Sequence, residues 1–277
     1  MIFTNSNQNQ ELFLSQLALK PAVLVQINST QGSVPREAGT WMAVFNDVVV
    51  GTIGGGHLEH QAIDQARSFL QADAKKPLEK LIRFALGPSL GQCCGGVVHL
   101  RFERVFAENI PALTTQLCPS LWPVALFGGG HVGHALVQVL SNLPFALSWI
   151  DSRDDVFPAS VPANVVCEVS SPVQWAVRQL PAQSRVLIMS FSHAEDFDVL
   201  VSCLERQRES FDLPYIGLIG SQTKWASFRS RLEARGFQPN ELAHITSPIG
   251  VPGITGKEPE MIAVAVAAQL LMTCNPL

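Results

Sequence analysis

One stretch of this chain, residues 124–140 (VALFGGGHVGHALVQVL), constrains the fold more than any other. Four apolar residues predict a buried strand, positions from 132 onward predict an amphipathic helix, and Gly128, Gly130 and Gly133 have the spacing of a dinucleotide-binding turn. Such glycines permit a tight turn, close approach of a pyrophosphate and close packing of helix on strand. The helix N-terminus would present free amide N–H groups to a phosphate. The alternative is a glycine-rich turn that binds nothing.

A carboxylate follows this turn at the position where a ribose would lie. Residues 145–150 predict a second strand, which ends at Asp151, eighteen residues after Gly133. An acidic residue at that point can accept hydrogen bonds from ribose hydroxyls. The sequence therefore predicts that a phosphate-bearing nucleotide or a pterin binds near the turn.

The rest of the C-terminal half alternates between predicted strands and helices. Further strands are expected at residues 165–169, 185–191 and 215–220. This alternation predicts a Rossmann-like, doubly wound parallel sheet over residues 124–277. Residues 109–123 contain three prolines and are predicted to be a linker. The fold class is therefore α/β, with an N-terminal α+β domain at residues 1–108 before the Rossmann-like domain.

Two loops in the N-terminal half are candidates for anion binding. Residues 28–40 form a polar, glycine-containing loop whose one cation, Arg36, is either an anion ligand or a solvated side chain. Residues 54–56 form a second glycine turn between a strand and a helix, which offers backbone amides to an anion. His57 and His60 lie one helical turn apart, but no third metal ligand is evident, so capping and polar-face roles are favoured.

The loop with the most reactive side chains is at residues 87–96 (GPSLGQCCGG). Cys93 and Cys94 are adjacent and lie among glycines, which leave the backbone approachable. A thiolate here would be a soft ligand for a heavy metal centre or a carrier of sulfane sulfur. A vicinal disulfide and simple burial are the alternatives. The six cysteines of the chain include no CxxC pair and no zinc-type spacing.

Charge and hydropathy argue against several classes of protein. The net charge is −4 and there is no basic run, so nucleic-acid binding is not expected. The N-terminus lacks the basic and apolar regions of a signal peptide, and the longest apolar helix, residues 261–272, is too short to cross a bilayer. That helix is expected to be buried on all sides. The cysteine usage favours a cytoplasmic protein with reduced thiols. No membrane partner is expected.

Three further loops, at residues 190–196, 220–224 and 247–257, are expected at the edge of the sheet where its strands end. His193 and Asp196 are either an acid–base pair or part of a helix cap. Lys224 either meets a phosphate or has no binding role.

Seven short runs follow one another along the chain. They are GSVPREAG at 32–39, GTIGGGHLE at 51–59, LGQCCGG at 90–96, FGGGHVG at 127–133, IDSR at 150–153, YIGLIGS at 215–221 and PIGVPG at 248–253. Together these runs resemble the XdhC/CoxI family of xanthine dehydrogenase accessory proteins. Any one run is common, whereas the ordered set is specific and covers nearly the whole chain.

The resemblance implies a molybdenum cofactor chaperone rather than an enzyme. Such a protein would bind this cofactor, a pterin with a dithiolene and a phosphate, and protect it while a cysteine desulfurase supports its sulfuration. It would then insert the cofactor into the xanthine dehydrogenase apoprotein, a role in purine catabolism, and a homodimer is expected. The residues implied to hold the cofactor are Cys93, Cys94, Gln92, Arg36, Gly128, Gly130, His131, Gly133 and Asp151, with the two cysteines as candidate molybdenum ligands.

The chain departs from the family pattern at one position. The family often has a histidine where this chain has Phe191, two residues before His193. A role that requires a histidine pair is therefore not expected, and His193 is a weak candidate for the site.

An NAD(P)-dependent oxidoreductase is the main alternative. It would account for the glycine turn and for Asp151. However, the only tyrosine, Tyr215, lies in a predicted strand, so no Tyr-x-x-x-Lys catalytic pair exists, and the adjacent cysteines would have no role. A redox or sulfur-sensing module that uses Cys93 and Cys94 is a third interpretation.

Overall fold

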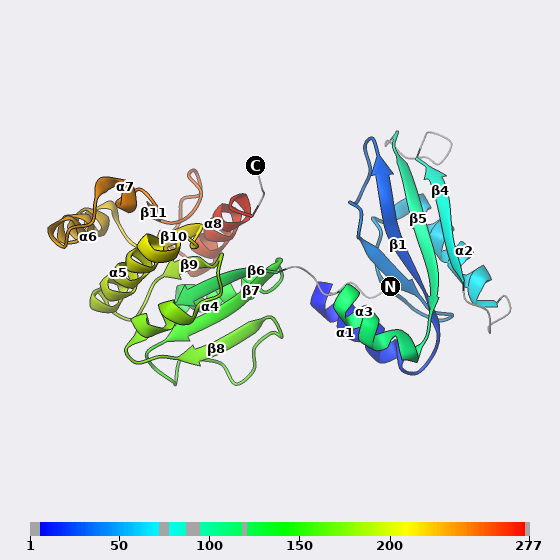
Figure 1. Ribbon diagram of the computed structural model, residues 1–277, viewed down its shortest axis with the longest axis horizontal. Coiled ribbons are helices and arrows are strands. Elements are labelled where there is room, and N and C mark those ends of the chain that lie inside the picture. The colour runs from blue at the N-terminus through cyan, green and yellow to red at the C-terminus, as the bar shows by residue number, and fades with distance from the viewer. Residues whose placement is uncertain (1–5, 72–77, 87–94, 118–120, 275–277) are drawn as a thin grey trace. The chain divides into compact units, whose positions relative to one another are not determined.

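The computed structural model describes residues 6–71, 78–86, 95–117 and 121–274 of the 277-residue chain. The chain divides into two compact units, Met1–Pro119 and Ser120–Leu277 (Figure 1). None of the described helices combines the length and the apolarity needed to cross a bilayer.

The first unit is an antiparallel sheet with helices on both faces. Its strand order is β3-β2-β1-β5-β4. The strands are β1 (Ala22–Gln31), β2 (Trp41–Val44), β3 (Val49–Gly51), β4 (Glu79–Ala85) and β5 (Val97–Val105). Side chains alternate across β1, so Val23 and Val25 pack under helix α2 (Gly56–Gln71), whereas Leu24 packs under α1 (Ser6–Leu17) and α3 (Ile110–Gln116).

The second unit is a parallel sheet covered on both faces. Its strand order is β11-β10-β9-β6-β7-β8. The strands are β6 (Trp122–Phe127), β7 (Phe145–Asp151), β8 (Val165–Val169), β9 (Arg185–Ile188), β10 (Tyr215–Leu218) and β11 (Ile245–Thr246). The order in which strands are added reverses at β6, which has β7 on one side and β9 on the other. In doubly wound folds the crevice at such a reversal is where ligands bind.

Helices from separate parts of the chain cover the two faces of this sheet. One face packs against α4 (His131–Leu140) and α8 (Pro259–Met272). The opposite face packs against η3 (Val173–Gln179), α5 (His193–Ser210) and α6 (Gln222–Ala234), and a short helix α7 (Pro239–Leu242) follows α6. This arrangement confirms the predicted Rossmann-like sheet.

The linker predicted at residues 109–123 differs from the structure. Residues of η2 (Ala107–Asn109) and α3 are helical, and Leu113 is buried in the first unit. Pro111 lies in the first turn of α3, where a missing N–H costs little, so this proline begins a helix instead of marking a linker. The two units divide after Pro119, and β6 begins two residues before the predicted strand.

Helix α8 was predicted to be buried on all sides, and this prediction is wrong. Ala263, Val266 and Leu270 face the core, whereas Val264 is 52% exposed and Met272 is 73% exposed. The helix packs beside α4 on one face of the sheet, so only the sides that face α4 and the sheet are covered. Apolar composition alone does not reveal how many sides of a helix have neighbours.

Candidate functional site

The glycine turn after β6 has the geometry of a dinucleotide-binding turn. Gly128 has a φ of +128°, and a Cβ there would lie 2.0 Å from the carbonyl oxygen of Met189. A Cβ on Gly133 would lie 2.2 Å from the oxygen of Gly128, so helix α4 packs directly against the turn. The structural roles predicted for the first and third glycines are thus confirmed. Gly130 caps α4, with open space around its Cβ position, and His131 beside it is exposed.

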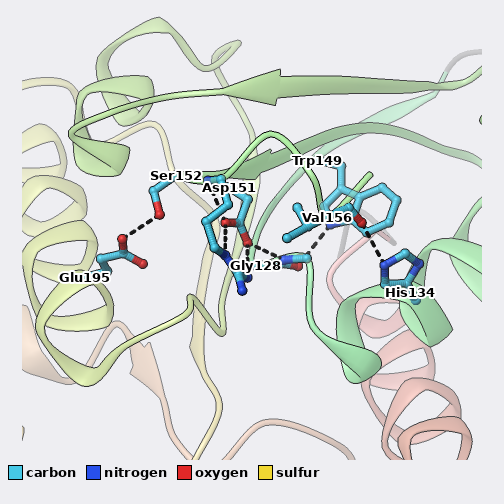
Figure 2. Close-up of polar contacts among 9 residues, drawn as sticks. Gly128, His134, Trp149, Asp151, Ser152, Val156 and Glu195 are labelled. Carbon is cyan, nitrogen blue, oxygen red and sulfur yellow. Dashed lines mark hydrogen bonds and ion pairs between the residues drawn. The ribbon is translucent and has the colours of Figure 1, made fainter. Parts of the chain in front are cut away.

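Asp151 is saturated by donors from the protein itself. It ends β7 and is 2% exposed. Its Oδ2 accepts a hydrogen bond from the N–H of Gly129 at 2.6 Å, and Oδ1 accepts from the N–H and Nε of Arg153 at 3.0 and 2.9 Å (Figure 2). The Nη2 of Arg153 adds a contact to Oδ2 at 3.0 Å. A ribose hydroxyl would have to displace these donors, so the arrangement does not favour the predicted ribose contact.

The charge of Asp151 is stabilised by the same contacts. Burial alone would raise the pKa of this carboxyl. The hydrogen bonds from the Arg153 side chain and from the N–H groups of Gly129 and Arg153 outweigh burial and hold its pKa below the usual value. The group is therefore an ionised internal partner of the glycine turn.

The segment after β7 folds back over the middle of the turn. A Cβ on Gly129 would lie 2.4 Å from a methyl carbon of Val156, so the second glycine makes room for this segment. His134 of α4 holds the segment in place, with its Nε2 at 3.0 Å from the oxygen of Val156 (Figure 2). The Nε1 of Trp149 donates to the oxygen of Gly128 at 3.0 Å. The surface of the turn that stays open is therefore at Gly130 and the start of α4.

Two contacts connect the end of β7 with the start of α5 across β6. The Ser152 hydroxyl donates to Oε1 of Glu195 at 2.6 Å (Figure 2). The Arg153 guanidinium lies 4.3 Å from the ring centroid of Phe191. The chain's own side chains therefore span the crevice in which a doubly wound sheet usually holds its ligand.

Lys224 and Asp196 form an ion pair beside this crevice. The Nζ of Lys224 donates to Oδ2 of Asp196 at 2.6 Å and to the oxygen of Ile219 at 2.8 Å. The N–H of Ser190 donates to the other oxygen of Asp196 at 2.6 Å. Because both oxygens of Asp196 have partners, an acid–base pair with His193 is not favoured. These residues line a cavity of about 390 Å³, with His193 exposed at the start of α5.

The first unit contains a larger cavity, of about 540 Å³. It is lined by Pro35, Arg36, Thr52, Gly54, Gly55, Gly56, Glu59, His60 and Ile63. A Cβ on Gly54 would lie 2.9 Å from Cβ of Pro35 and 3.3 Å from Cγ of Arg36, so the loop of Arg36 packs on the second glycine turn. The structure thus brings together two runs that lie about twenty residues apart in the sequence.

The end of the cysteine loop contacts the same region. A Cβ on Gly96 would lie 2.4 Å from the oxygen of Ser33, and Gly32 approaches the Cα of Gly96. Cys93, Cys94 and Gln92 lie outside the described residues, so their predicted roles stay predictions. Gly95 and Gly96, the described end of this third run, lie next to the loop of Arg36.

A carboxylate also fills the second glycine turn. Glu59 is 3% exposed and accepts hydrogen bonds from the N–H groups of Ile53 at 3.0 Å and Gly55 at 3.1 Å. Its Oε2 also accepts from the Thr52 hydroxyl at 2.5 Å. The amides of Ile53 and Gly55 are therefore occupied, and the guanidinium of Arg36 is the permanent positive charge that an anion would meet in the cavity.

Neither Glu59 nor Arg153 was among the residues predicted for the site. A signal was present for Glu59, because a carboxylate in the first turn of a helix is placed to accept hydrogen bonds from the amides before it. Arg153 lies two residues after Asp151, within reach of its carboxylate. The described cysteines, Cys167, Cys203 and Cys274, are free, and burial raises the pKa of the Cys203 thiol to about 12. Within the described residues, no three metal-binding side chains come together.

Both units match one family of proteins. Residues 124–270 match the profile of the XdhC Rossmann domain, and residues 17–84 match that of the XdhC and CoxI family. The chain belongs to the XdhC and CoxI family. The resemblance noted from the seven runs is thereby confirmed.

Two individual proteins illustrate the relationship. The uncharacterized protein YqeB of Escherichia coli (strain K12) is 25% identical over 256 residues, which are 92% of this chain but 44% of YqeB. The chain therefore spans less than half the length of this curated relative. A crystal structure from Bacillus halodurans, described as a xanthine dehydrogenase, has a TM-score of 0.75 and 22% sequence identity to this chain. The alignment covers 96% of this chain and 95% of the Bacillus halodurans chain. At this identity the likeness establishes the fold alone.

Proposed function

We propose that this XdhC-family protein takes part in the maturation of xanthine dehydrogenase as a molybdenum cofactor chaperone. It would bind the cofactor as cargo, protect it while a cysteine desulfurase supports its sulfuration, and insert it into the apoprotein. The observation that supports this proposal is that two family runs, those of Arg36 and of Gly54–Gly56, line one cavity of the first unit. The described end of a third run, Gly95 and Gly96, contacts the loop that carries Arg36.

The residues around this cavity fit the chemistry of the cargo. A volume of about 540 Å³ lies in the range of small-molecule sites. Arg36 offers a planar cation to the phosphate, and bare glycine backbone lets a flat pterin approach closely. The amides of Ile53 and Gly55 donate to Glu59 and that of Gly54 donates to Thr52, so side chains would hold the phosphate. Cys93 and Cys94 would supply soft sulfur ligands to the molybdenum or its sulfur.

Because Arg36 lines the cavity, the Arg36→Ala substitution should weaken cofactor binding. This change should lower the amount of cofactor retained per chain about tenfold, because a charge-assisted contact to phosphate is lost. The measurement is the fluorescence of the oxidised pterin after purification from cells that make the cofactor. Glu37→Ala alters the neighbouring exposed residue and is the matched control. Equal retention by both variants would remove Arg36 from the phosphate site.

The alternative NAD(P)-dependent oxidoreductase has less support. The Asp151 carboxylate is occupied by Gly129 and Arg153, and Val156 lies over the glycine turn. An oxidoreductase function would also leave the cavity of the first unit without a role. A nucleotide at the open end of the turn, near Gly130 and His131, is compatible with the chaperone function. Sustained oxidation of NADH with candidate carbonyl substrates would favour the oxidoreductase instead.

A further inference from the structure

The carboxylate of Glu59 uses only one of its two oxygens within the described part of the chain. Oε2 accepts hydrogen bonds from the Thr52 hydroxyl and from the N–H groups of Ile53 and Gly55. No group among the described residues donates to Oε1. The side chain lines the cavity of the first unit, and Oε1 is not one of the atoms sealed away from solvent. The free oxygen of this nearly buried side chain therefore opens onto the cavity.

The donors of the turn next to Glu59 are already engaged. The N–H of Gly54 donates to Oγ1 of Thr52, and the Thr52 hydroxyl donates in turn to Glu59. Arg36 lines the same cavity, yet in the described residues it makes no ion pair with Glu59. A carboxylate oxygen only accepts hydrogen bonds, and leaving it without a donor in a nearly buried place costs free energy. A ligand that brings an N–H group to Oε1 is therefore favoured over one that brings an oxygen.

We infer, on the basis of the proposed function, that Oε1 of Glu59 accepts an N–H from the aminopyrimidinone edge of the pterin and makes the cavity specific for this ring. That edge of a pterin carries an amino group and a ring N–H, which are both donors. A hydrogen bond from N–H to a carboxylate is charge-assisted and about twice as strong as a neutral one. Glu59 would bind the ring and Arg36 the phosphate, so the acid and the base of one cavity recognise opposite ends of the cargo.

The fold fixes the position of this acceptor before any ligand binds. Glu59 lies in the first turn of α2, where the aligned peptide dipoles favour a carboxylate. Three hydrogen bonds to Oε2 hold the side chain against the backbone of the turn. An acceptor that is already ordered loses little conformational entropy on binding, so more of its interaction energy distinguishes one ligand from another. Glu59 is therefore placed to determine specificity as well as to support the glycine turn.

The Glu59→Gln substitution tests this role because it keeps the turn and reverses the free hydrogen-bonding group. The amide oxygen of glutamine can accept from Thr52, Ile53 and Gly55, and its NH2 group then takes the place of Oε1. The probes are hydroxymethylpterin monophosphate and the corresponding lumazine, in which a carbonyl oxygen replaces the amino group. In calorimetric titrations, the wild-type full chain should bind the pterin about tenfold more tightly than the lumazine. Glu59→Gln should lower this ratio of affinities about tenfold or more.

Two controls separate recognition from folding. Glu37→Gln makes the same change on an exposed side chain in the loop of Arg36 and should keep the wild-type ratio of affinities. Glu59→Gln should unfold at the wild-type urea concentration, whereas Glu59→Ala, which removes the acceptor of three donors, should unfold at a lower one. A wild type that binds neither probe or both equally, or a folded Glu59→Gln with the wild-type ratio, would overturn the role of Glu59. The proposed function fails on a different result, the absence of pterin from wild-type protein purified from cells that make the cofactor.

Discussion

Gly128→Ala is expected to destabilise the second unit by about 3–5 kcal/mol, since it combines left-handed backbone strain with overpacking. The residue has a φ of +128°, and an added Cβ would lie 2.0 Å from the oxygen of Met189 in the adjacent strand connection. Backbone cannot move aside there without breaking the pairing of β6 with β9. Such a loss is a large share of the stability of an ordinary domain.

Gly130→Ala is the matched control for this prediction. Gly130 lies two residues further along the same turn, has a φ of −80°, and has open space around its Cβ position. This change should alter the free energy of unfolding by less than about 1 kcal/mol. Urea denaturation monitored by tryptophan fluorescence compares the two variants. If both variants unfold at the wild-type urea concentration, the close contact of the turn with Met189 is wrong.

Asp151→Ala is expected to cost about 2–4 kcal/mol, because it leaves the buried N–H of Gly129 and the Arg153 guanidinium without their shared acceptor. Asp151→Asn keeps an oxygen at the site and should cost less. Asp154→Ala changes an exposed carboxylate three residues away and should have little effect. Thermal and urea unfolding of the three variants measure these differences. Equal stability of the Asp151 and Asp154 variants would show that the carboxylate does not hold the turn.

The contribution of Asp151 should depend on pH with a definite sign. Its pKa is lowered in the folded protein, so its contribution is fully present above its ordinary value of 3.8 and is lost as the pH falls through the folded value. The stability difference between wild type and Asp151→Asn should therefore be constant near neutral pH and shrink below about pH 4. A difference that grows on acidification would contradict the lowered pKa.

The doubly wound sheet was predictable because its physical causes are local. Buried parallel strands require continuous apolar runs, such as residues 124–127. A helix that begins close to a strand requires a glycine where the two pack together, and here this residue is Gly133. The ends of elements were less predictable. Pro111 begins α3, although a proline also suits a linker, and α8 is apolar on a side that the unit leaves exposed.

The chemistry of the two glycine turns could not be predicted from spacing. A row of free amides attracts an anion, but the sequence does not say whether that anion is a ligand or a side chain of the protein. Here Glu59 fills one turn from four residues away and Asp151 fills the other from the next strand. The cavity beside Arg36 was likewise invisible, because it depends on the packing of Gly54 against Pro35. The sequence did identify the runs that meet there.

The most direct test of the proposed function is the molybdenum cofactor content of the purified chain. Wild-type protein and the double variant Cys93→Ala with Cys94→Ala would be isolated from cells that make the cofactor, and the oxidised pterin quantified by fluorescence. The chaperone function predicts close to one pterin per wild-type chain and a loss of about tenfold or more in the variant, because soft sulfur ligands are removed. Wild-type protein without pterin, when it is folded and isolated under the same conditions, would contradict the function. Equal pterin in both proteins would remove the two cysteines from the site.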